Sequence, residues 1–240
     1  MAEKTNLKVS YKNELNLIPL RKFNSKEMDL FFALCAKMKG KEQDSIRFDF
    51  ADLKELSDYK PTAVKRFADD LESLYDKMLH LTYRDEFEEE GLRRKFVLFT
   101  GFEISEKHSY VEVSVNPKLK HVLNNLENEF TKYELKSFTE IRSTYAKTLF
   151  RLLMQYQSTR FYTVKITEFR DLMDIPSYYK MGNIDQTVLK PALKELNNYF
   201  ENLKVQKVKA KKGNKIDKLE FTFSGLKSDL PKVPLHDWTK

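Results

Sequence analysis

The stretch Phe161-Tyr-Thr-Val-Lys-Ile-Thr-Glu-Phe-Arg-Asp-Leu-Met-Asp-Ile175 has the pattern of a strand that leads into a short helix. Alternation over Tyr162 to Ile166 predicts the strand, and Thr167 is placed to cap the helix. Pro176 forbids further helix. The apolar stripe of this predicted helix comprises Ile166, Phe169, Leu172 and Ile175.

A second periodic segment runs from Ile184 to Phe200 and predicts a longer helix. Two strands follow, from Leu203 to Ala210 and from Ile216 to Ser224. The loop between them carries three lysines, Lys211, Lys212 and Lys215. Helix, turn, second helix and basic hairpin is the order of a winged helix-turn-helix. In such a unit the second helix enters a DNA groove and the hairpin reaches a neighbouring groove or the backbone.

The net charge of +7 is unevenly distributed along the 240 residues. Residues 1 to 128 hold 22 Lys and Arg against 23 Asp and Glu, whereas residues 129 to 240 hold 21 against 13. The entire positive excess therefore lies in the half that contains the predicted winged motif. A basic excess raises affinity for phosphate backbones, although it also suits a solvated surface that aids solubility.

Composition argues for a globular protein of the cytoplasm. Charged residues make up 33% and apolar residues 41%, as in ordinary soluble domains. The apolar runs are too short to span a bilayer, and the N-terminus lacks a secretion signal, so we expect no membrane association. A single cysteine, Cys35, on an apolar helical face indicates a buried structural thiol rather than a disulfide.

The order of elements predicted for the C-terminal half also occurs in the N-terminal half. The segment Phe50 to Tyr59 matches Ile166 to Ile175 at four apolar positions. We therefore predict an α+β protein with two tandem winged helix-turn-helix domains, residues 1–128 and 129–240, with a loosely ordered tail at 226–240. In the first domain Lys95 to Ile104 is predicted as one strand. In the second, Ser137 is predicted to cap one long helix.

No catalytic apparatus is evident. The six glycines form neither a Gly-x-x-x-x-Gly-Lys-Ser/Thr loop nor a Gly-x-Gly-x-x-Gly turn, which argues against nucleotide binding. The four histidines are isolated, so we expect no metal site and no cofactor. A rolling-circle nicking enzyme would need two histidines flanking one apolar residue beside a nucleophilic tyrosine, and that pair is missing. The glutamates at 86 and 88–90 indicate a solvated hairpin tip rather than a divalent metal site.

Three segments resemble the plasmid replication initiators of initiator family 3. They are Phe138-Thr-Glu-Ile-Arg-Ser-Thr-Tyr-Ala-Lys-Thr-Leu-Phe-Arg-Leu-Leu153, Phe169-Arg-Asp-Leu172 and Val188-Leu-Lys-Pro-Ala-Leu-Lys-Glu-Leu-Asn197. The family pattern is an Ile-Arg-Ser-x-Tyr-Ala helix, a strand, a Phe/Leu-Arg-x-Leu helix and a Val-Leu-x-Pro-Ala-x-x-Glu-Ile-Asn helix. Leu196 stands where isoleucine is usual. The resemblance covers about residues 20 to 225 and is looser in the N-terminal half.

The resemblance implies two winged helices that bind directly repeated duplex sites, called iterons, at a plasmid origin and help to open it. It also implies a homodimer through the N-terminal domain that represses the initiator's own promoter, and partners in the host helicase or primase machinery. Two other functions remain open at this stage. One is a transcriptional repressor of the same fold, and the other is a nicking or strand-transfer enzyme.

The residues themselves indicate where DNA would be contacted. In the second helix Asn183, Gln186, Thr187 and Lys190 could reach base edges, with Pro191 expected to kink or divide the helix behind them. Lysines of the hairpin and nearby cations would contact phosphates, as would a polar set in the N-terminal half. These contacts are Lys180, Lys194, Lys207, Lys209, Lys211, Lys212, Lys215, Arg142, Lys60, Thr62, Lys65 and Arg66. Arg142 and Lys147 both lie off the apolar stripe of their helix and could reach the DNA backbone, and a surface salt bridge is the alternative role for each of them.

A dimer contact is predicted on the N-terminal strands. The strand Lys95 to Ile104 carries apolar residues on both alternating sets, so that one face would remain after the core is covered. Val97 and Phe99 mark that surplus face. The alternative is that it packs against the segment from Pro117 to Leu126.

Overall fold

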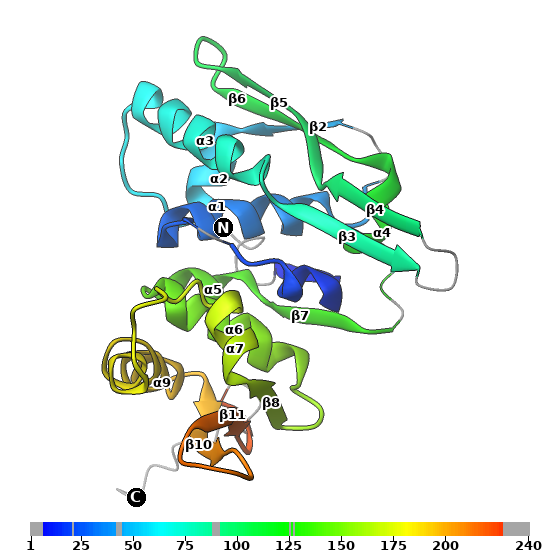
Figure 1. Ribbon diagram of the computed structural model, residues 1–240. Coiled ribbons are helices and arrows are strands. Elements are labelled where there is room, and N and C mark those ends of the chain that lie inside the picture. The colour runs from blue at the N-terminus through cyan, green and yellow to red at the C-terminus, as the bar shows by residue number, and fades with distance from the viewer. Residues whose placement is uncertain are drawn as a thin grey trace, which may run out of the picture.

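The structure is a computed structural model that describes residues 7–20, 22–41, 45–87, 92–124, 126 and 128–227. Its elements form two groups, one above the other in Figure 1. The first consists of β1 (Lys8–Lys12), η2 (Asn13–Leu17), α1 (Ser25–Met38), β2 (Ser45–Asp49), α2 (Phe50–Leu56), α3 (Val64–Met78), β3 (Thr82–Phe87), β4 (Leu92–Val97), β5 (Phe99–Ser105), β6 (Tyr110–Val115), η4 (Pro117–Leu119) and α4 (Lys120–Leu123).

The second group has the same kinds of elements. It consists of β7 (Phe130–Glu134), α5 (Leu135–Glu140), α6 (Thr144–Gln155), β8 (Phe161–Lys165), α7 (Ile166–Leu172), α8 (Met181–Asn183), the π-helical turn η5 (Ile184–Leu189), α9 (Lys190–Leu196), β9 (Phe200–Glu201), β10 (Lys204–Lys209), β11 (Ile216–Thr222) and β12 (Gly225–Leu226).

The two groups share one topology. In the first, a three-stranded antiparallel sheet has the order β2-β6-β5, and in the second the order is β10-β11-β8. In each group the strand before the short helix pairs with the last strand of the hairpin that follows the longer helix. Two tandem winged helices, an α+β arrangement, are therefore present as predicted.

The predicted repeat extends to the way in which α2 and α7 end. Asp58 has φ +50° and Asp174 has φ +51°, the left-handed region that a helix end often adopts. The next residue then donates its N–H back into the helix, from Tyr59 to Lys54 O at 2.8 Å and from Ile175 to Arg170 O at 2.9 Å. The same turn thus ends the first helix of both helix-turn-helix motifs.

The long helix predicted from Ser137 is two helices. The chain leaves α5 at Ile141, which is extended at φ −71° and ψ 133°, and α6 starts anew at Thr144. The cap of α6 is Ser143, whose Oγ accepts the Ala146 N–H at 3.3 Å. Thr167 is likewise not a cap, because α7 already begins at Ile166 and Lys165 occupies the cap position without a side-chain bond.

The strand predicted from Lys95 to Ile104 is also divided. A bend at Leu98 separates β4, which pairs with β3, from β5, which belongs to the β2-β6-β5 sheet. Asn116 fixes this bend, because its Nδ2 donates to Val97 O at 3.0 Å and its main-chain N–H to Leu98 O at 2.9 Å. Phe99 is fully buried with its ring 5.9 Å from that of Phe31. The predicted surplus apolar face therefore does not include Phe99, whereas Val97 is half-buried.

A two-stranded sheet and a set of buried polar groups join the two groups. Strand β1 pairs with β7 over five residue pairs, from Lys8↔Glu134 to Lys12↔Phe130. Beneath it, the fully buried Lys147 of α6 forms an ion pair with Asp29 of α1 and donates to Phe138 O at 3.0 Å. Burial raises the pKa of Asp29 to about 6 and lowers the pKa of Lys147, and each charge opposes the shift of the other. Lys147 is therefore a structural residue and does not reach DNA.

Arg151, one helical turn after Lys147, is the largest fully buried side chain among the described residues. Its Nη2 donates to Leu15 O at 3.0 Å, and its guanidinium lies 4.8 Å from the ring centre of Phe32. Asn16 continues this network to the other group, donating to Thr131 Oγ1 at 2.8 Å and to Gln155 Oε1 at 3.0 Å. Helix α6 thus packs against the first group through charged residues that are almost entirely desolvated.

None of the helices in the described part of the chain is both long enough and apolar enough to cross a lipid bilayer.

We predict that Lys147→Ala lowers the free energy of unfolding by about 3–5 kcal/mol, because it leaves the Asp29 carboxylate buried without its counter-ion. The double variant Asp29→Leu/Lys147→Met removes both charges and should be much less destabilised than the single variant. Urea unfolding followed by circular dichroism measures both. Lys136→Ala, at an exposed lysine of α5, is the control and should change stability by less than about 0.5 kcal/mol. If Lys136→Ala and Lys147→Ala lowered the free energy of unfolding equally, Lys147 would not be a structural residue that stabilises the fold through its buried ion pair.

Candidate nucleic-acid interface

Helix α7 is fixed by its apolar stripe, as the sequence predicts. Phe169 is fully buried with its ring 6.0 Å from Phe221 of β11, and Leu172 is also buried. On the outer side of the helix, Arg170 bonds three carbonyl groups of the following turn. Its Nη1 donates to Tyr179 O at 2.9 Å, and its Nη2 donates to Pro176 O at 2.9 Å and to Ser177 O at 3.0 Å. One guanidinium therefore shapes the turn that leads to the second helix.

The second helix is continuous but changes its winding. It begins with the single turn α8, continues as the π-helical turn η5 and becomes α-helical from Lys190. Pro191 lacks an N–H, and its ring would crowd the carbonyl four residues earlier in a regular α-helix. The wider π turn lies just before it, so the helix changes its winding ahead of Pro191 and is not divided there. Val188, Ala192 and Leu196 remain fully buried on one face.

The opposite face of this helix is polar and accessible. Gln186, Thr187 and Lys190 are exposed, as is Lys194 one turn further on. Asn183 is exposed as well, but its Oδ1 accepts the Lys180 N–H at 2.9 Å, so this side chain also caps the start of the helix. Gln and Lys at such positions have the donors that major-groove base edges accept.

The wing is the hairpin of β10 and β11, closed by a bond from Ala210 N to Lys215 O at 2.9 Å. Gly213 at its tip has φ +88°, a conformation that glycine adopts without strain. The predicted phosphate-binding lysines of this hairpin are all exposed, namely Lys207, Lys209, Lys211, Lys212 and Lys215, as is Lys204. The tip therefore presents a concentrated positive charge to solvent.

Two carboxylates hold the second helix in place. Asp185 forms an ion pair with Lys207 of β10, which ties the start of the helix to the wing. Glu195 accepts the main-chain N–H groups of Arg142 at 2.5 Å and of Ser143 at 3.2 Å. It thereby satisfies donors at the start of α6, a helix end where negative charge is favourable. The side chain of Arg142 itself is exposed.

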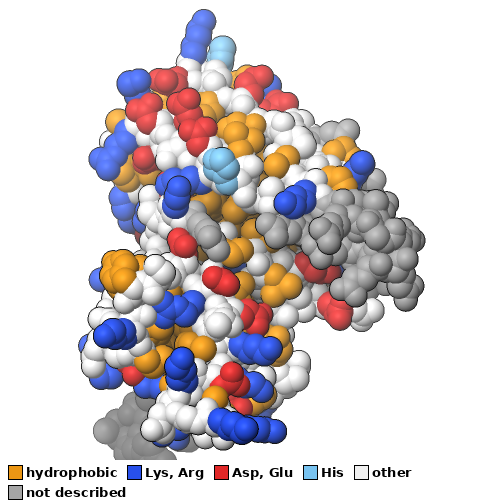
Figure 2. All heavy atoms as spheres, viewed as in Figure 1, with side chains coloured by type: hydrophobic (Ala, Val, Ile, Leu, Met, Phe, Trp, Pro, Cys, Tyr) orange, Lys and Arg blue, Asp and Glu red, His pale blue; other side chains and the backbone are white. Residues whose placement is uncertain are grey.

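The corresponding surface of the first winged helix is weaker in positive charge. Lys60, Thr62, Lys65 and Arg66 are all exposed before and at the start of α3. Lys60 forms an ion pair with Asp58 at 2.5 Å, and Lys65 lies 3.8 Å from Asp69. Figure 2 shows Asp and Glu side chains clustered over the upper part of the molecule, whereas Lys and Arg predominate in the lower part. The charge imbalance of the sequence is thus also a spatial imbalance.

The sequence did not indicate how the turn of the second helix-turn-helix is built. Arg170 was evident only as a motif residue, and nothing in the sequence indicated that it bonds the carbonyl groups of the following turn. The same turn presents Tyr178, which is 78% exposed with its ring 5.1 Å from that of Tyr179. Tyr178 therefore presents an accessible aromatic ring at the turn that precedes the second helix.

The described part of the chain offers neither a metal-binding cluster nor an accessible cysteine thiol. It contains no cluster of three or more His, Cys, Asp or Glu that could hold a metal ion. Cys35 is fully buried, and burial raises the pKa of its thiol to about 12, so it is a poor nucleophile at neutral pH. The predicted acidic tip at residues 88–90 and most of the predicted loose tail, residues 228–240, lie outside the described residues.

Comparison with known proteins agrees with this architecture. Residues 8–154 match the family described as initiator replication protein, WH1, and residues 165–223 match initiator Rep protein, WH2. A "Probable replication protein rep" of Bifidobacterium longum (strain NCC 2705) is 30% identical over 219 residues, covering 90% of this chain and 72% of that protein.

The Pi initiator protein, solved in complex with iteron DNA, is similar in fold with a TM-score of 0.71, although only 16% of residues are identical. The alignment covers 91% of this chain and 97% of Pi. Domains 2 and 3 of RctB align less well, with a TM-score of 0.48. The chain belongs to the family of initiator replication proteins, with the WH1 and WH2 winged helices in tandem.

Proposed function

We propose that this initiator recognises repeated duplex sites of the iteron kind at a plasmid origin and helps to open the duplex there. The observation that carries the proposal is the second winged helix, which presents an accessible polar helix face and a wing tip with Lys211, Lys212 and Lys215 on one basic unit. The similarity of fold to Pi, a protein solved with iteron DNA, supports it. Binding rather than catalysis is the activity proposed, and no cofactor enters it.

The proposed contacts divide into two kinds. Gln186, Thr187 and Lys190, with Asn183, read base edges, because they lie near the start of the second helix and point to solvent. The remaining cations bind phosphates and set affinity and register. They are Lys180, Lys194, Lys207, Lys209, Lys211, Lys212, Lys215 and Arg142, joined by Lys60, Thr62, Lys65 and Arg66 of the first winged helix. Lys207 is proposed to bind phosphate even though its ammonium group also forms an ion pair with Asp185.

We further propose that a homodimer forms through the first winged helix, and that host helicase or primase proteins are recruited at the origin. Control of plasmid copy number and repression of the initiator's own promoter would follow from the balance of monomer and dimer. We also propose that the boundary between the two winged-helix domains lies near residue 128. Strand β1 then joins the second unit's β7 across that boundary.

Removal of the wing charge should weaken all DNA binding. We predict that Lys211→Ala/Lys212→Ala/Lys215→Ala weakens iteron and random duplexes alike and reduces the slope of log K against log salt by about 0.9 per lost phosphate contact. Fluorescence anisotropy over a salt series measures this. The triple Lys→Arg variant keeps the charge and should retain both affinity and slope. A triple alanine variant that loses only sequence preference would assign the wing to base reading instead.

The second helix should control discrimination. We predict that Gln186→Ala or Lys190→Ala reduces the preference for the iteron over a single-base variant by about 1–3 kcal/mol at one base pair, and leaves binding to random DNA nearly unchanged. Competition gel shifts with a set of single-base variants measure this preference. Asn198→Ala, at an exposed position past the end of α9, is the control. Equal weakening of all duplexes by Gln186→Ala would show that its role is general affinity.

The proposed dimer contact can be tested at Val97, which is half-buried at the end of β4 and pairs with Thr82 of β3. We predict that Val97→Lys gives a folded monomer that still binds a single iteron, because a charge at this edge opposes pairing of two copies. Analytical ultracentrifugation and a one-site gel shift measure the two properties. Phe99→Lys is a contrasting variant that should unfold, since Phe99 is in the core. A Val97→Lys variant that stays dimeric would place the contact elsewhere.

A further inference from the structure

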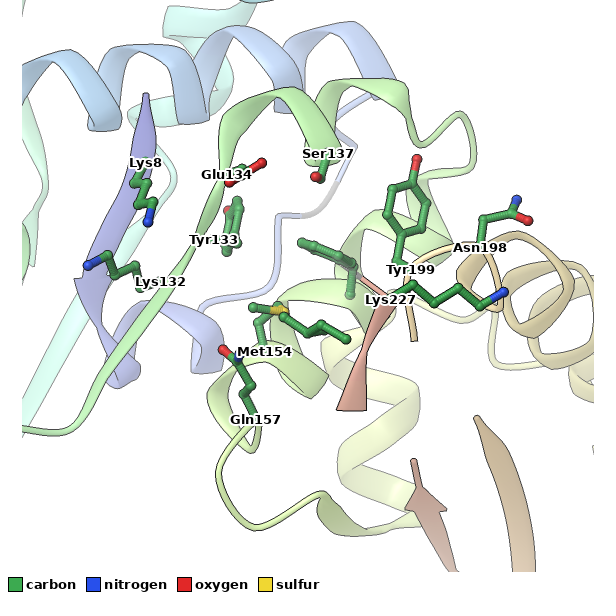
Figure 3. A pocket seen from close by; sticks show the side chains of 12 residues that line it. Lys8, Lys132, Tyr133, Glu134, Ser137, Met154, Gln157, Asn198, Tyr199 and Lys227 are labelled. Atoms are coloured by element: carbon green, nitrogen blue, oxygen red, sulfur yellow. The ribbon is translucent and has the colours of Figure 1, made fainter. Parts of the chain in front are cut away.

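Two cavities lie side by side along strand β7. The first, about 420 Å³, is lined by Glu134, Ser137, Phe150, Tyr199 and Lys227 among others. The second, about 470 Å³, extends past Phe130 toward Arg160. Both cavities are lined by Lys132, Met154, Gln157 and Leu226. They therefore form one groove between β7 and β12, with residues of α6 at its base, as Figure 3 shows for the first cavity.

The wall formed by β7 is an open strand edge. Two bonds set the pattern of the β1–β7 ladder, from Asn13 N to Glu129 O and from Leu135 N to Leu7 O, both at 2.9 Å. Hydrogen-bonded pairs recur at every second residue of an antiparallel ladder. The N–H and C=O of Lys132 therefore point away from β1, on the side of the groove. In the portion of the chain that the structure describes, these two groups have no hydrogen-bond partner.

The opposite wall is open in the same way. Strand β12 pairs with β9, and a bond from Lys227 N to Tyr199 O at 2.9 Å fixes the alternation. By the same argument the N–H and C=O of Leu226, which lines both cavities, point away from β9. Neighbouring strands of a sheet lie about 4.8 Å apart, rise about 3.4 Å per residue and form layers about 10 Å thick, so a residue occupies about 160 Å³. Each cavity thus has room for about two or three residues of extended chain.

The groove is apolar below and positive at its rim. Phe150 and Met154 are the apolar residues of α6 that line the first cavity, and both are at most 5% exposed. Lys8, Lys132 and Lys227 line the first cavity and are exposed, with Glu134 as the one carboxylate among its lining residues. Partial burial and the charges of Lys132 and Lys8 lower the pKa of Lys39, so the positive charges of these lysines act on one another.

We infer that this groove binds an extended, acidic segment of another protein, which adds as a strand between β7 and β12. Main-chain bonds to Lys132 and Leu226 would hold the segment, apolar side chains at alternate positions would enter over Phe150 and Met154, and carboxylates would meet the rim lysines. A DNA duplex is too wide to reach main-chain groups inside this groove. Residues 229–234 of the chain itself are unsuited, because Pro231 and Pro234 lack the N–H groups that a central strand donates. Deletion of residues 228–240 tests whether the remainder of this C-terminal segment is the occupant instead.

The inference can be tested on the full chain with a fluorescein-labelled peptide, Asp-Val-Glu-Val-Asp-Val-Glu with blocked ends, and its Lys-for-acid counterpart. We expect the acidic peptide alone to bind and to slow amide exchange in residues 130–134 and 225–227. The double variant Lys132→Glu/Lys227→Glu should weaken binding at least about tenfold, because two attractive charge pairs become repulsive. Lys136→Glu, on the neighbouring α5, is the control and should leave binding unchanged.

A second pair of variants separates main-chain from charge effects. Lys132→Pro removes the N–H that points to the groove while the bonds to β1 remain, so it should bind the peptide more weakly than Lys132→Ala. Iteron binding and thermal stability of each variant are measured in parallel and should be retained. Four results would each overturn the inference. They are equal affinity for the basic peptide, no binding at millimolar peptide, loss of iteron binding in Lys132→Glu/Lys227→Glu, and tighter peptide binding after deletion of residues 228–240.

Discussion

The buried contact between α6 and the first winged helix is the constraint on which the arrangement depends. Lys147 and Arg151 enter an apolar core, and such burial of charge is tolerated only when every charge and donor is satisfied. Asp29 supplies the counter-ion for Lys147, and Leu15 O accepts from Arg151. These partners come from the N-terminal part of the chain, so they fix the position and orientation of α6 against the first winged helix. An apolar contact of the same size would specify the relative position less sharply.

The proposed DNA-binding unit is built outward from this same helix. Glu195 caps the start of α6 and thereby anchors the end of the second helix, while Asp185 anchors its beginning to the wing through Lys207. Arg170 holds the intervening turn by three carbonyl groups. All of these are charge-assisted bonds, which are stronger and more directional than neutral ones. These bonds hold the second helix as a whole, so the exposed residues that are proposed to read DNA are positioned by the helix and need no contacts with one another.

The duplicated architecture has diverged mainly in charge. Both helix-turn-helix motifs end their first helix with the same left-handed Asp and the same main-chain bond. The second carries exposed lysines on its wing, whereas cations of the first are partly paired with Asp58 and Asp69. Phosphate binding depends on the number of unpaired cations, so one fold can serve as the main DNA contact in one copy and as an auxiliary contact in the other. The remaining surface is then available for protein partners.

The sequence by itself determined the tandem winged-helix order, the repeat of Phe50–Tyr59 in Ile166–Ile175, the basic second half and the exposed polar face around Gln186. Periodicity and local charge carry this information, because each is set by neighbours in the chain. Tertiary structure decided the fate of Lys147, the split of the predicted long helix at Ile141 and the burial of Phe99. Each of these depends on a residue distant in sequence, namely Asp29, Glu195 and Phe31. The open edges of β7 and β12 also became visible only in space, since strand pairing is non-local and leaves no periodic signal.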